Sequence, residues 1–191
     1  MPYDHILTDD EKRELLRIAR ATLREYTRTG FVPPGRPHRQ SLLDPAGAFV
    51  TLHRDGQLRG CIGTLQETQP LYKVVQEMTV AAASRDGRFE PVRAEEVDDI
   101  DIEISVLGGR RRVRGPDEIE VGRHGLCLTK AFHRGLLLPQ VAVEHGWDAQ
   151  TFLDHVCLKA GLPPGSWRAP DAVVEVFTAQ VFGERDLPAR G

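Results

Sequence analysis

The residue with the most distinctive chemistry is Cys61, in the segment 58–63, Leu-Arg-Gly-Cys-Ile-Gly. A cysteine reacts as its thiolate, and a nearby positive charge favours the thiolate over the thiol. Arg59 stands two residues before Cys61, so both side chains are expected on one face if the segment is a β-strand. Cys61 is therefore a candidate catalytic nucleophile and Arg59 its candidate activator. A small buried cysteine packed in a glycine-rich strand is at least as good an interpretation.

Two glycines, Gly60 and Gly63, flank this cysteine. Glycine weakens a strand, so its presence there needs a physical reason. Three reasons are open: a β-bulge, tight packing under a helix, or the close approach of a ligand to the backbone. The third reason makes both glycines candidate substrate-binding residues.

His53 is the nearest candidate base, because a nucleophilic cysteine usually needs one and histidine is the most common. It precedes an Asp-Gly pair at 55–56 that is typical of a tight β-hairpin. With a two- or four-residue loop, His53 pairs with Leu58 and points away from Cys61. With a three-residue loop, His53 faces Arg59 and Thr51 faces Cys61, so that His53 shares the cysteine's face. His53 is accordingly a candidate substrate-binding residue whose role depends on the hairpin register.

Gln140 and Glu144 lie four residues apart at the start of an expected helix, so they share one face of it. Together with Arg59 and Cys61 they could line one polar cleft, with Glu144 as a candidate catalytic acid or base and Gln140 as a candidate substrate-binding residue. An equally good interpretation is that Gln140 ties the helix to a neighbouring strand by hydrogen bonds.

Asp86 and Arg88 flank a turn, where structural roles are favoured: Asp86 as a cap, and Arg88 paired with it or with another carboxylate. The spacings His124-x-x-Cys127 and His155-x-Cys157 match no known zinc-ligand pattern. The chain also lacks a Gly-x-Gly-x-x-Gly, phosphate-binding-loop or nucleophile-elbow pattern. We therefore expect neither a metal nor another cofactor.

The bulk composition indicates an ordinary globular protein, with 191 residues of which 40% are hydrophobic and 28% charged. A net charge of −3 and a pI near 6.2 argue against nonspecific binding to nucleic acid or anionic membrane. The basic run 110–114 has no interleaved aromatic residues and follows an expected strand, which favours a solvated turn.

The start of the sequence resembles no signal peptide, and no stretch is long enough for a membrane span. Three widely spaced cysteines suit free thiols in a reducing compartment. These features predict a cytoplasmic protein.

Hydrophobic periodicity and turn signals predict an α+β fold, in which a mainly antiparallel β-sheet is flanked by helices. We expect a compact single domain with a smaller subdomain over residues 8–183, between flexible termini at 1–7 and 184–191. The expected helices are 9–29, 68–84, 139–145 and one that Asp148 caps and Gly161 ends; the expected strands are 48–53, 58–65, 100–107, 125–131, 136–138 and 173–182.

The segment 58–63 resembles the six-residue signature of the AMMECR family, named for the AMME syndrome chromosomal region. Further segments resemble family blocks in the same order, and the likeness covers most of the chain from Thr8 to about Phe182. These segments are 47–52, 86–92, 104–107, 137–142, Glu144, Trp147, 152–153 and 159–162.

The resemblance implies a two-part α/β domain with an antiparallel sheet, cytoplasmic in prokaryotes. In bacteria and archaea such proteins are called AmmeMemoRadiSam system protein A, because their genes accompany those of a Memo-like protein and a radical SAM enzyme. It therefore suggests these two proteins as partners. Two functions stay open: an enzyme or enzyme subunit that uses a cleft thiol on a small molecule, and a noncatalytic module that docks a partner protein.

Overall fold

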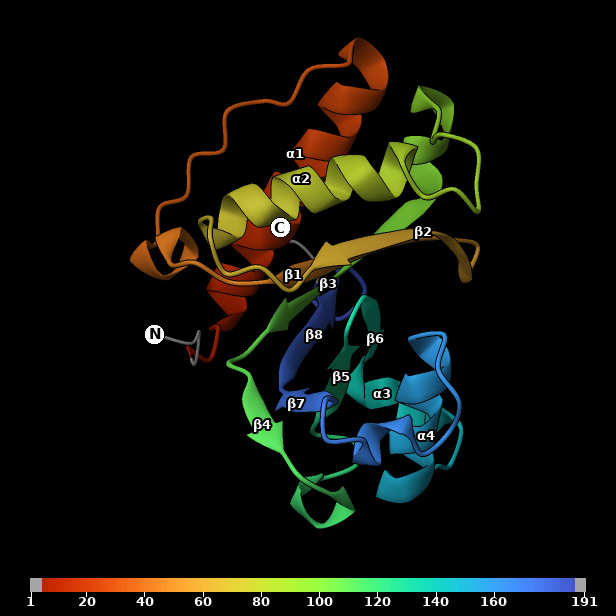
Figure 1. Cartoon of the computed structure of the whole chain (residues 1–191). Helices are drawn as coiled ribbons and strands as arrows, with labels where there is room; N and C mark the ends of the chain where they lie inside the picture. The colour runs from red at the N-terminus through yellow and green to blue at the C-terminus, as the bar shows by residue number, and fades with distance from the viewer. Residues whose placement is uncertain (1–4, 188–191) are drawn as a thin grey trace. The chain divides into compact units, whose positions relative to one another are not determined.

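The computed structural model describes residues 5–187, which divide into two compact units. The large unit holds residues 5–107 and 180–187, and the small unit holds residues 108–179. Each unit has a four-stranded sheet with helices packed on it (Figure 1). Neighbouring strands within each sheet pair in antiparallel fashion. The predicted α+β class is thereby confirmed.

The sheet of the large unit has the strand order β2-β1-β3-β8, which leaves β2 at an edge. Its strands are β1 (Ala48–Arg54), β2 (Gln57–Thr64), β3 (Ile100–Leu107) and β8 (Ala179–Gly183); its helices are α1 (Asp9–Thr29) and α2 (Leu71–Ser84), with short 3₁₀ turns at Gln40–Leu43 and Ala94–Asp99.

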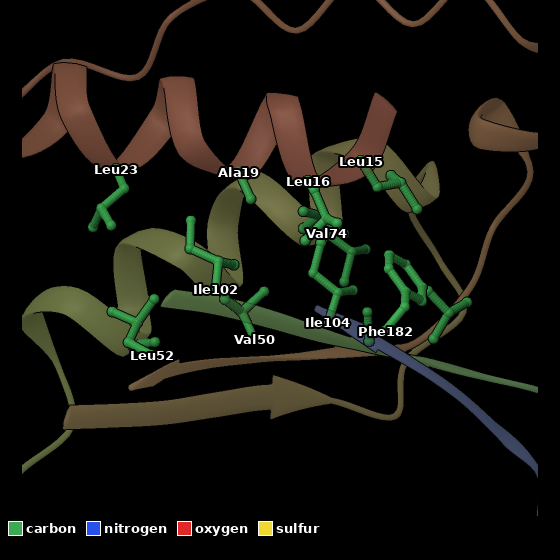
Figure 2. Close-up of a cluster of buried hydrophobic side chains, with 14 of the residues drawn as sticks. Leu15, Leu16, Ala19, Leu23, Val50, Leu52, Val74, Ile102, Ile104 and Phe182 are labelled. Atoms are coloured by element: carbon green, nitrogen blue, oxygen red, sulfur yellow. The ribbon is translucent and has the colours of Figure 1, made fainter. Parts of the chain in front are cut away.

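Helices α1 and α2 cover one face of this sheet, because alternate residues of β1 and β3 are apolar (Figure 2). Val50 and Ile104 are fully buried on that face beneath Leu15 and Ala19 of α1. Thr51 lies between two of these buried positions, so its side chain points to the opposite face. Because of this alternation, only the residues of β1 and β2 that point away from the two helices are available for a functional site.

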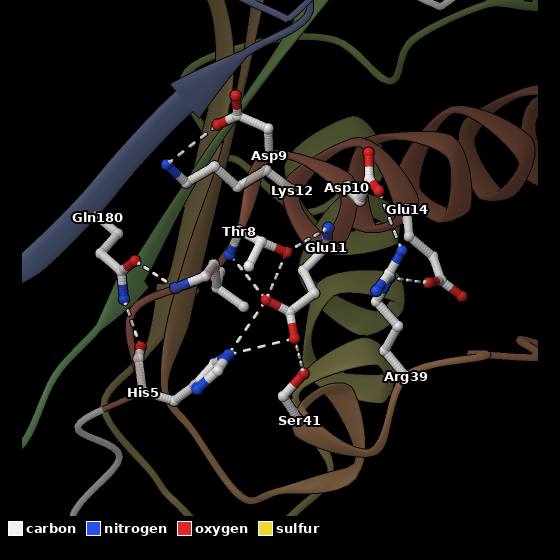
Figure 3. Close-up of polar contacts among 11 residues, drawn as sticks. His5, Thr8, Asp9, Asp10, Glu11, Lys12, Glu14, Arg39, Ser41 and Gln180 are labelled. Carbon is white, nitrogen blue, oxygen red and sulfur yellow. Dashed lines mark hydrogen bonds and ion pairs between the residues drawn. The ribbon is translucent and has the colours of Figure 1, made fainter.

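The start of α1 is fixed by a capping box, as Thr8 and Glu11 predict from their spacing (Figure 3). The Glu11 carboxylate accepts hydrogen bonds from the backbone of Thr8 at 2.7 Å, from Ser41 and from His5 at 3.1 Å. Burial alone would raise the pKa of Glu11, but the bonds from Ser41, Thr8 and His5 outweigh it and lower the pKa to about 2.

The small unit has the strand order β4-β7-β5-β6. Phe152, Val156 and Leu153 of one helix bury their side chains against Leu126 and Leu128 of the sheet. The elements are β4 (Arg111–Val113), β5 (Gly125–Lys130), β6 (His133–Leu137), β7 (Val173–Phe177), α3 (Pro139–Glu144) and α4 (Ala149–Lys159), with 3₁₀ turns at Pro116–Glu118 and Ser166–Arg168.

The structure corrects two expectations about strands. The single strand expected at 173–182 is two strands, β7 and β8, which belong to different sheets and are separated by Thr178. The solvated turn expected at 110–114 contains the edge strand β4, because Arg111–Val113 pairs with β7. Both errors arise because periodicity reports which face is buried and not which sheet a strand joins.

The predicted flexible termini lie partly outside the described residues, at 1–4 and 188–191. Within the described part, the backbone N–H of Leu7 donates to Gln180 Oε1 at 2.9 Å, and Glu184 is bonded to Arg20. Among residues 5–187, no helix combines the length and the apolar character needed to cross a membrane.

The lowered pKa of Glu11 predicts a pH-dependent stability. Its folded-state pKa of about 2 lies below the ordinary value of 4.5, so its contribution is present above pH 4.5 and is lost as the pH falls towards 2. Glu11→Gln should lower the free energy of unfolding by on the order of 2 kcal/mol at pH 7, and the difference from wild type should shrink at pH 4 and again at pH 3. Urea denaturation at the three pH values measures this. The exposed Glu95 provides the control, because Glu95→Gln should change little; a pH-independent difference for Glu11→Gln would contradict the assignment.

Candidate functional site

The β1–β2 hairpin combines features of both expected registers. Its loop has two residues, Asp55 and Gly56, both at positive φ (53° and 76°). His53 therefore pairs with Leu58, as a two-residue loop predicts. Beyond that pair the register shifts by one residue at a β-bulge. Thr51 then pairs with Cys61, which was expected only for a three-residue loop.

Arg59 is the extra residue of the bulge, and its guanidinium is bonded to groups other than the cysteine. Nε and Nη2 donate to the two carboxylate oxygens of Glu96 at 3.2 and 3.0 Å. Nη1 donates to the carbonyl of Glu90 at 2.9 Å, and Nη2 also reaches the carbonyl of Pro91 at 3.4 Å. The bond from Arg59 is the main reason why the pKa of Glu96 falls to about 2, against the opposing effect of burial. This arginine therefore joins β2 to the segment that precedes β3.

Cys61 is partly buried and is held by hydrogen bonds at both its side chain and its backbone. The Thr51 hydroxyl donates to Sγ at 3.3 Å. The backbone N–H of Cys61 donates to Asp86 Oδ2 at 2.9 Å. Since β2 is an edge strand, this N–H has no strand partner on that side, and Asp86 takes the place of one.

Asp86 in turn holds Arg88 beside the cysteine. Arg88 Nε and Nη2 donate to the two Asp86 oxygens at 2.9 and 2.6 Å, and its backbone N–H donates to Oδ1 at 3.2 Å. These bonds from Arg88 hold the pKa of the buried Asp86 well below its ordinary value. The pKa of Arg88 is raised, mainly by its hydrogen bonds to Asp86 and to a smaller extent by its electrostatic interaction with Cys61. The Arg88 side chain is 57% exposed, so its charge is open to solvent and to a ligand.

The two glycines beside Cys61 have packing reasons. A Cβ at Gly60 would lie 2.2 Å from the backbone oxygen of Ala82 in α2. A Cβ at Gly63 would lie 2.1 Å from Cγ of Phe49, whose ring covers it from the neighbouring strand. Tight packing under a helix, one of the three reasons left open by the sequence, therefore accounts for Gly60. Their role as substrate-binding residues stays a prediction.

His53 lines a cavity of about 240 Å³ with Asp101, Glu103 and the segment 183–186. The hydrogen bond that the structure gives to Cys61 Sγ comes from Thr51 and not from His53. No bond joins His53 to Cys61 within the described part of the chain. The Cys61–His53 pair therefore gains no support from the geometry.

Gln140 and Glu144 belong to α3 of the small unit, whereas Cys61 and Arg59 belong to the large unit. Glu144 is exposed, and Gln140 Oε1 is buried without a hydrogen-bond partner in the described residues. A cleft shared by all four residues stays a prediction. Within residues 5–187 no group of three or more His, Cys, Asp or Glu side chains is arranged to hold a metal ion.

Sequence reasoning placed Thr51 opposite Cys61 only for a three-residue hairpin loop, and it did not place Asp86 or Arg88 at the cysteine. The pairing of Thr51 with Cys61 depends on a β-bulge, which the glycines of the strand allowed as one of three reasons but did not place at Arg59. The segment Asp86-Gly87-Arg88 did carry a signal, because it lies in a block that resembles the family, but a turn motif gives no information about which distant strand it contacts.

A family model, AMMECR1, matches residues 16–182 of this chain. The chain belongs to the AMMECR1 family. The AMMECR1 match spans most of both units and includes the whole segment 58–63. The resemblance inferred from that segment and the other blocks is thereby confirmed.

Relatives and a solved structure agree with this AMMECR1 assignment. The chain is 44% identical to Protein MK0488 of Methanopyrus kandleri, over 94% of this chain and 91% of that protein. It is 43% identical to Protein PF1979 of Pyrococcus furiosus, over 93% and 90%. The crystal structure of the uncharacterized protein PH0010 from Pyrococcus horikoshii is similar with a TM-score of 0.85, 40% identity and 92% of each chain covered. These similarities show the family and the fold and assign no reaction.

The close approach at Gly60 predicts a large effect of one methyl group. Gly60→Ala places a Cβ against a backbone oxygen of α2, which cannot move like a side chain, and should lower the free energy of unfolding by about 3 kcal/mol, the upper end of ordinary overpacking. The control is Gly87→Ala, because a Cβ at Gly87 meets nothing within 4 Å. Urea denaturation measures both, and equal stabilities of the two variants would contradict the proposed contact.

Proposed function

We propose that this protein is an enzyme, or an enzyme subunit, in which Cys61 acts as a nucleophile on a small molecule. The observation that carries the proposal is the hydrogen-bonded group Thr51–Cys61–Asp86–Arg88. It holds the side chain of a half-buried cysteine in a fixed position close to an exposed positive charge. That charge comes from Arg88, and Arg59 supports the site by holding the bulge beside it.

Each member of this group has a specific effect on the sulfur. The Thr51 hydroxyl donates to Sγ, and such a bond stabilises a thiolate more than a thiol. Arg88 places a positive charge near the sulfur, and the neighbouring Asp86 carboxylate offsets part of its field. Because Arg88 is open to solvent, it favours a substrate that itself carries a negative charge.

The simplest step consistent with this arrangement is addition to a carbonyl group. A bond forms between Cys61 Sγ and the carbonyl carbon, the carbon–oxygen π bond breaks, and the proton released by the thiol is taken up by the carbonyl oxygen through solvent. This step needs neither an oxidant nor a leaving group. We place the activity in the cytoplasm, where reducing conditions keep a free cysteine available.

Alkylation tests whether the sulfur is accessible. Iodoacetamide should modify Cys61 alone in the folded protein, because Cys127 and Cys157 are fully buried. Mass spectrometry of peptides locates the label, and Cys61→Ser should abolish labelling under native conditions. If Cys61 reacts no faster than the two buried cysteines, the nucleophile proposal is wrong.

A charged and a neutral reagent together test the role of Arg88. Iodoacetate carries a negative charge and iodoacetamide does not, so the guanidinium should favour the first reagent over the second. Arg88→Gln should lower the ratio of the two alkylation rates by about threefold or more, as expected for the loss of a partly screened charge. The matched control is Arg85→Gln, which removes an exposed arginine at the end of α2. An unchanged ratio in Arg88→Gln would exclude Arg88 as the anion-attracting residue.

A second candidate function is a noncatalytic module that docks a partner protein, and Phe132 favours it. Phe132 is fully exposed at the two-residue turn between β5 and β6, where the preceding Ala131 has a φ of 51°. The family resemblance suggests a Memo-like protein and a radical SAM enzyme as the partners.

Phe132→Ser should abolish co-purification with the Memo-like protein, whereas Leu158→Ser, at another exposed apolar position of the small unit, should not. Failure of the wild-type protein to bind either partner at micromolar concentration would count against this function.

A further inference from the structure

The small unit contains a cavity of about 690 Å³ that no part of the Cys61 proposal uses. It is bordered by β4, by the start of β7 and by the 3₁₀ turn Ser166–Arg168. Its volume lies within the range of roughly 300–1,000 Å³ that is usual for small-molecule sites. The cavity is therefore large enough for an organic ligand and not only for a few water molecules.

The charged side chains at this cavity are mostly positive. Arg112, Arg114 and Arg168 line it together with a single carboxylate, Glu118. Glu118 accepts the backbone N–H of Arg114 at 2.8 Å and Arg111 Nη1 at 3.1 Å, and these bonds lower its pKa, so that it stays ionised at neutral pH. Three positive charges and one negative charge leave the lining with a net charge of two positive.

Two of these arginines have unused hydrogen-bonding capacity. Neighbouring arginines have partners, since Arg110 pairs with Glu175 at 3.4 Å and Arg111 with Glu118. In the part of the chain that the structure describes, the side chains of Arg112 and Arg114 make no hydrogen bond and no ion pair. Each guanidinium carries five N–H donors in a planar fork that suits phosphate oxygens.

Trp167 gives the cavity an aromatic wall. Its indole N–H donates to Asp154 Oδ1 at 3.0 Å, so the polar atom of the ring is already satisfied. The Arg168 guanidinium lies 4.1 Å from the ring centroid, and Arg168 Nη2 donates to Gln150 at 3.1 Å. Val173 adds apolar surface to the same cavity. The wall is thereby held in place and suits an apolar or aromatic group.

We propose that this cavity binds a small organic phosphate. A phosphate monoester carries between about 1.5 and 2 negative charges at pH 7, which matches the net charge of the lining. Arg112 and Arg114 bind the phosphate oxygens, and the organic part of the ligand packs on Trp167. This site lies within the small unit and does not depend on the chemistry of Cys61.

The test uses phenyl phosphate as the probe, titrated calorimetrically into the full-length protein at low ionic strength. We expect saturable binding to wild type that weakens about tenfold or more in the double variant Arg112→Gln/Arg114→Gln, because two charge-assisted contacts are lost. The matched control is Arg123→Gln/Arg134→Gln, which removes the same charge from exposed positions of the small unit outside the cavity. The control should bind like wild type, and so should Cys61→Ser. Circular dichroism verifies that each variant is folded.

Further ligands distinguish the parts of the site. Inorganic phosphate should bind more weakly than phenyl phosphate because it lacks the ring, and benzoate should bind more weakly because it carries a single charge. Absence of saturable binding to wild type would overturn the proposal, as would an equal loss in the two double variants. Equal affinity for inorganic phosphate and phenyl phosphate would contradict the role given to Trp167.

Discussion

The geometry around Cys61 depends on one contact between two backbones, where Gly60 of β2 meets the carbonyl of Ala82 in α2. Because position 60 has no Cβ, the helix lies directly against the edge strand of the sheet. Helix α2 ends at Ser84, only two residues beyond this contact, and the chain then reaches Asp86. Asp86 therefore lies next to Cys61, the residue that follows Gly60 in β2, and accepts a hydrogen bond from its backbone N–H. A side chain at position 60 would separate the helix from the strand and Asp86 from the cysteine.

In the small unit a helix also packs closely on a glycine of a strand, but no comparable site forms there. A Cβ at Gly135 of β6 would lie 2.5 Å from the Val156 oxygen and 2.6 Å from the Ala160 nitrogen of the covering helix region. The contact places the Ala160 carbonyl 3.0 Å from Nδ1 of His133, and both groups are thereby satisfied. Close packing of a helix on a glycine is thus a general way to fix a strand. At Cys61 this packing matters for the proposed chemistry, because the Thr51 hydroxyl and the Asp86–Arg88 ion pair meet at the same cysteine.

Local signals in the sequence were sufficient for most elements and insufficient for the site. The capping box at Thr8 and the glycine at Gly30 predicted α1 with the bounds 9–29 that the structure has, because both signals act within one helical turn. The alternation of Ile100–Leu107 likewise predicted β3. The glycines allowed a β-bulge in β2, but its position at Arg59 was not predictable in this way, because it depends on how β2 is anchored by Glu96 and α2, which are distant in sequence. Hairpin loops of two and of three residues gave opposite predictions of whether His53 shares the face of Cys61. Because of the bulge, the two-residue loop correctly predicted the partner of His53, and the three-residue loop correctly predicted the partner of Thr51.

The arginines show why residue spacing alone is a weak guide to charge. Arg59 lies closest to Cys61 along the chain, yet its guanidinium donates to two carboxylate oxygens and two carbonyls and adds little free charge for a ligand. Arg88 is 27 positions away in sequence, but Asp86 holds it at the cysteine with its charge exposed. The same division occurs in the small unit, where Arg111 is paired with Glu118 while Arg112 next to it has no partner in the described residues. A guanidinium can bind a ligand only through the N–H donors that are not already used in hydrogen bonds within the protein. The number of such free donors depends on the folded structure and cannot be read from residue spacing.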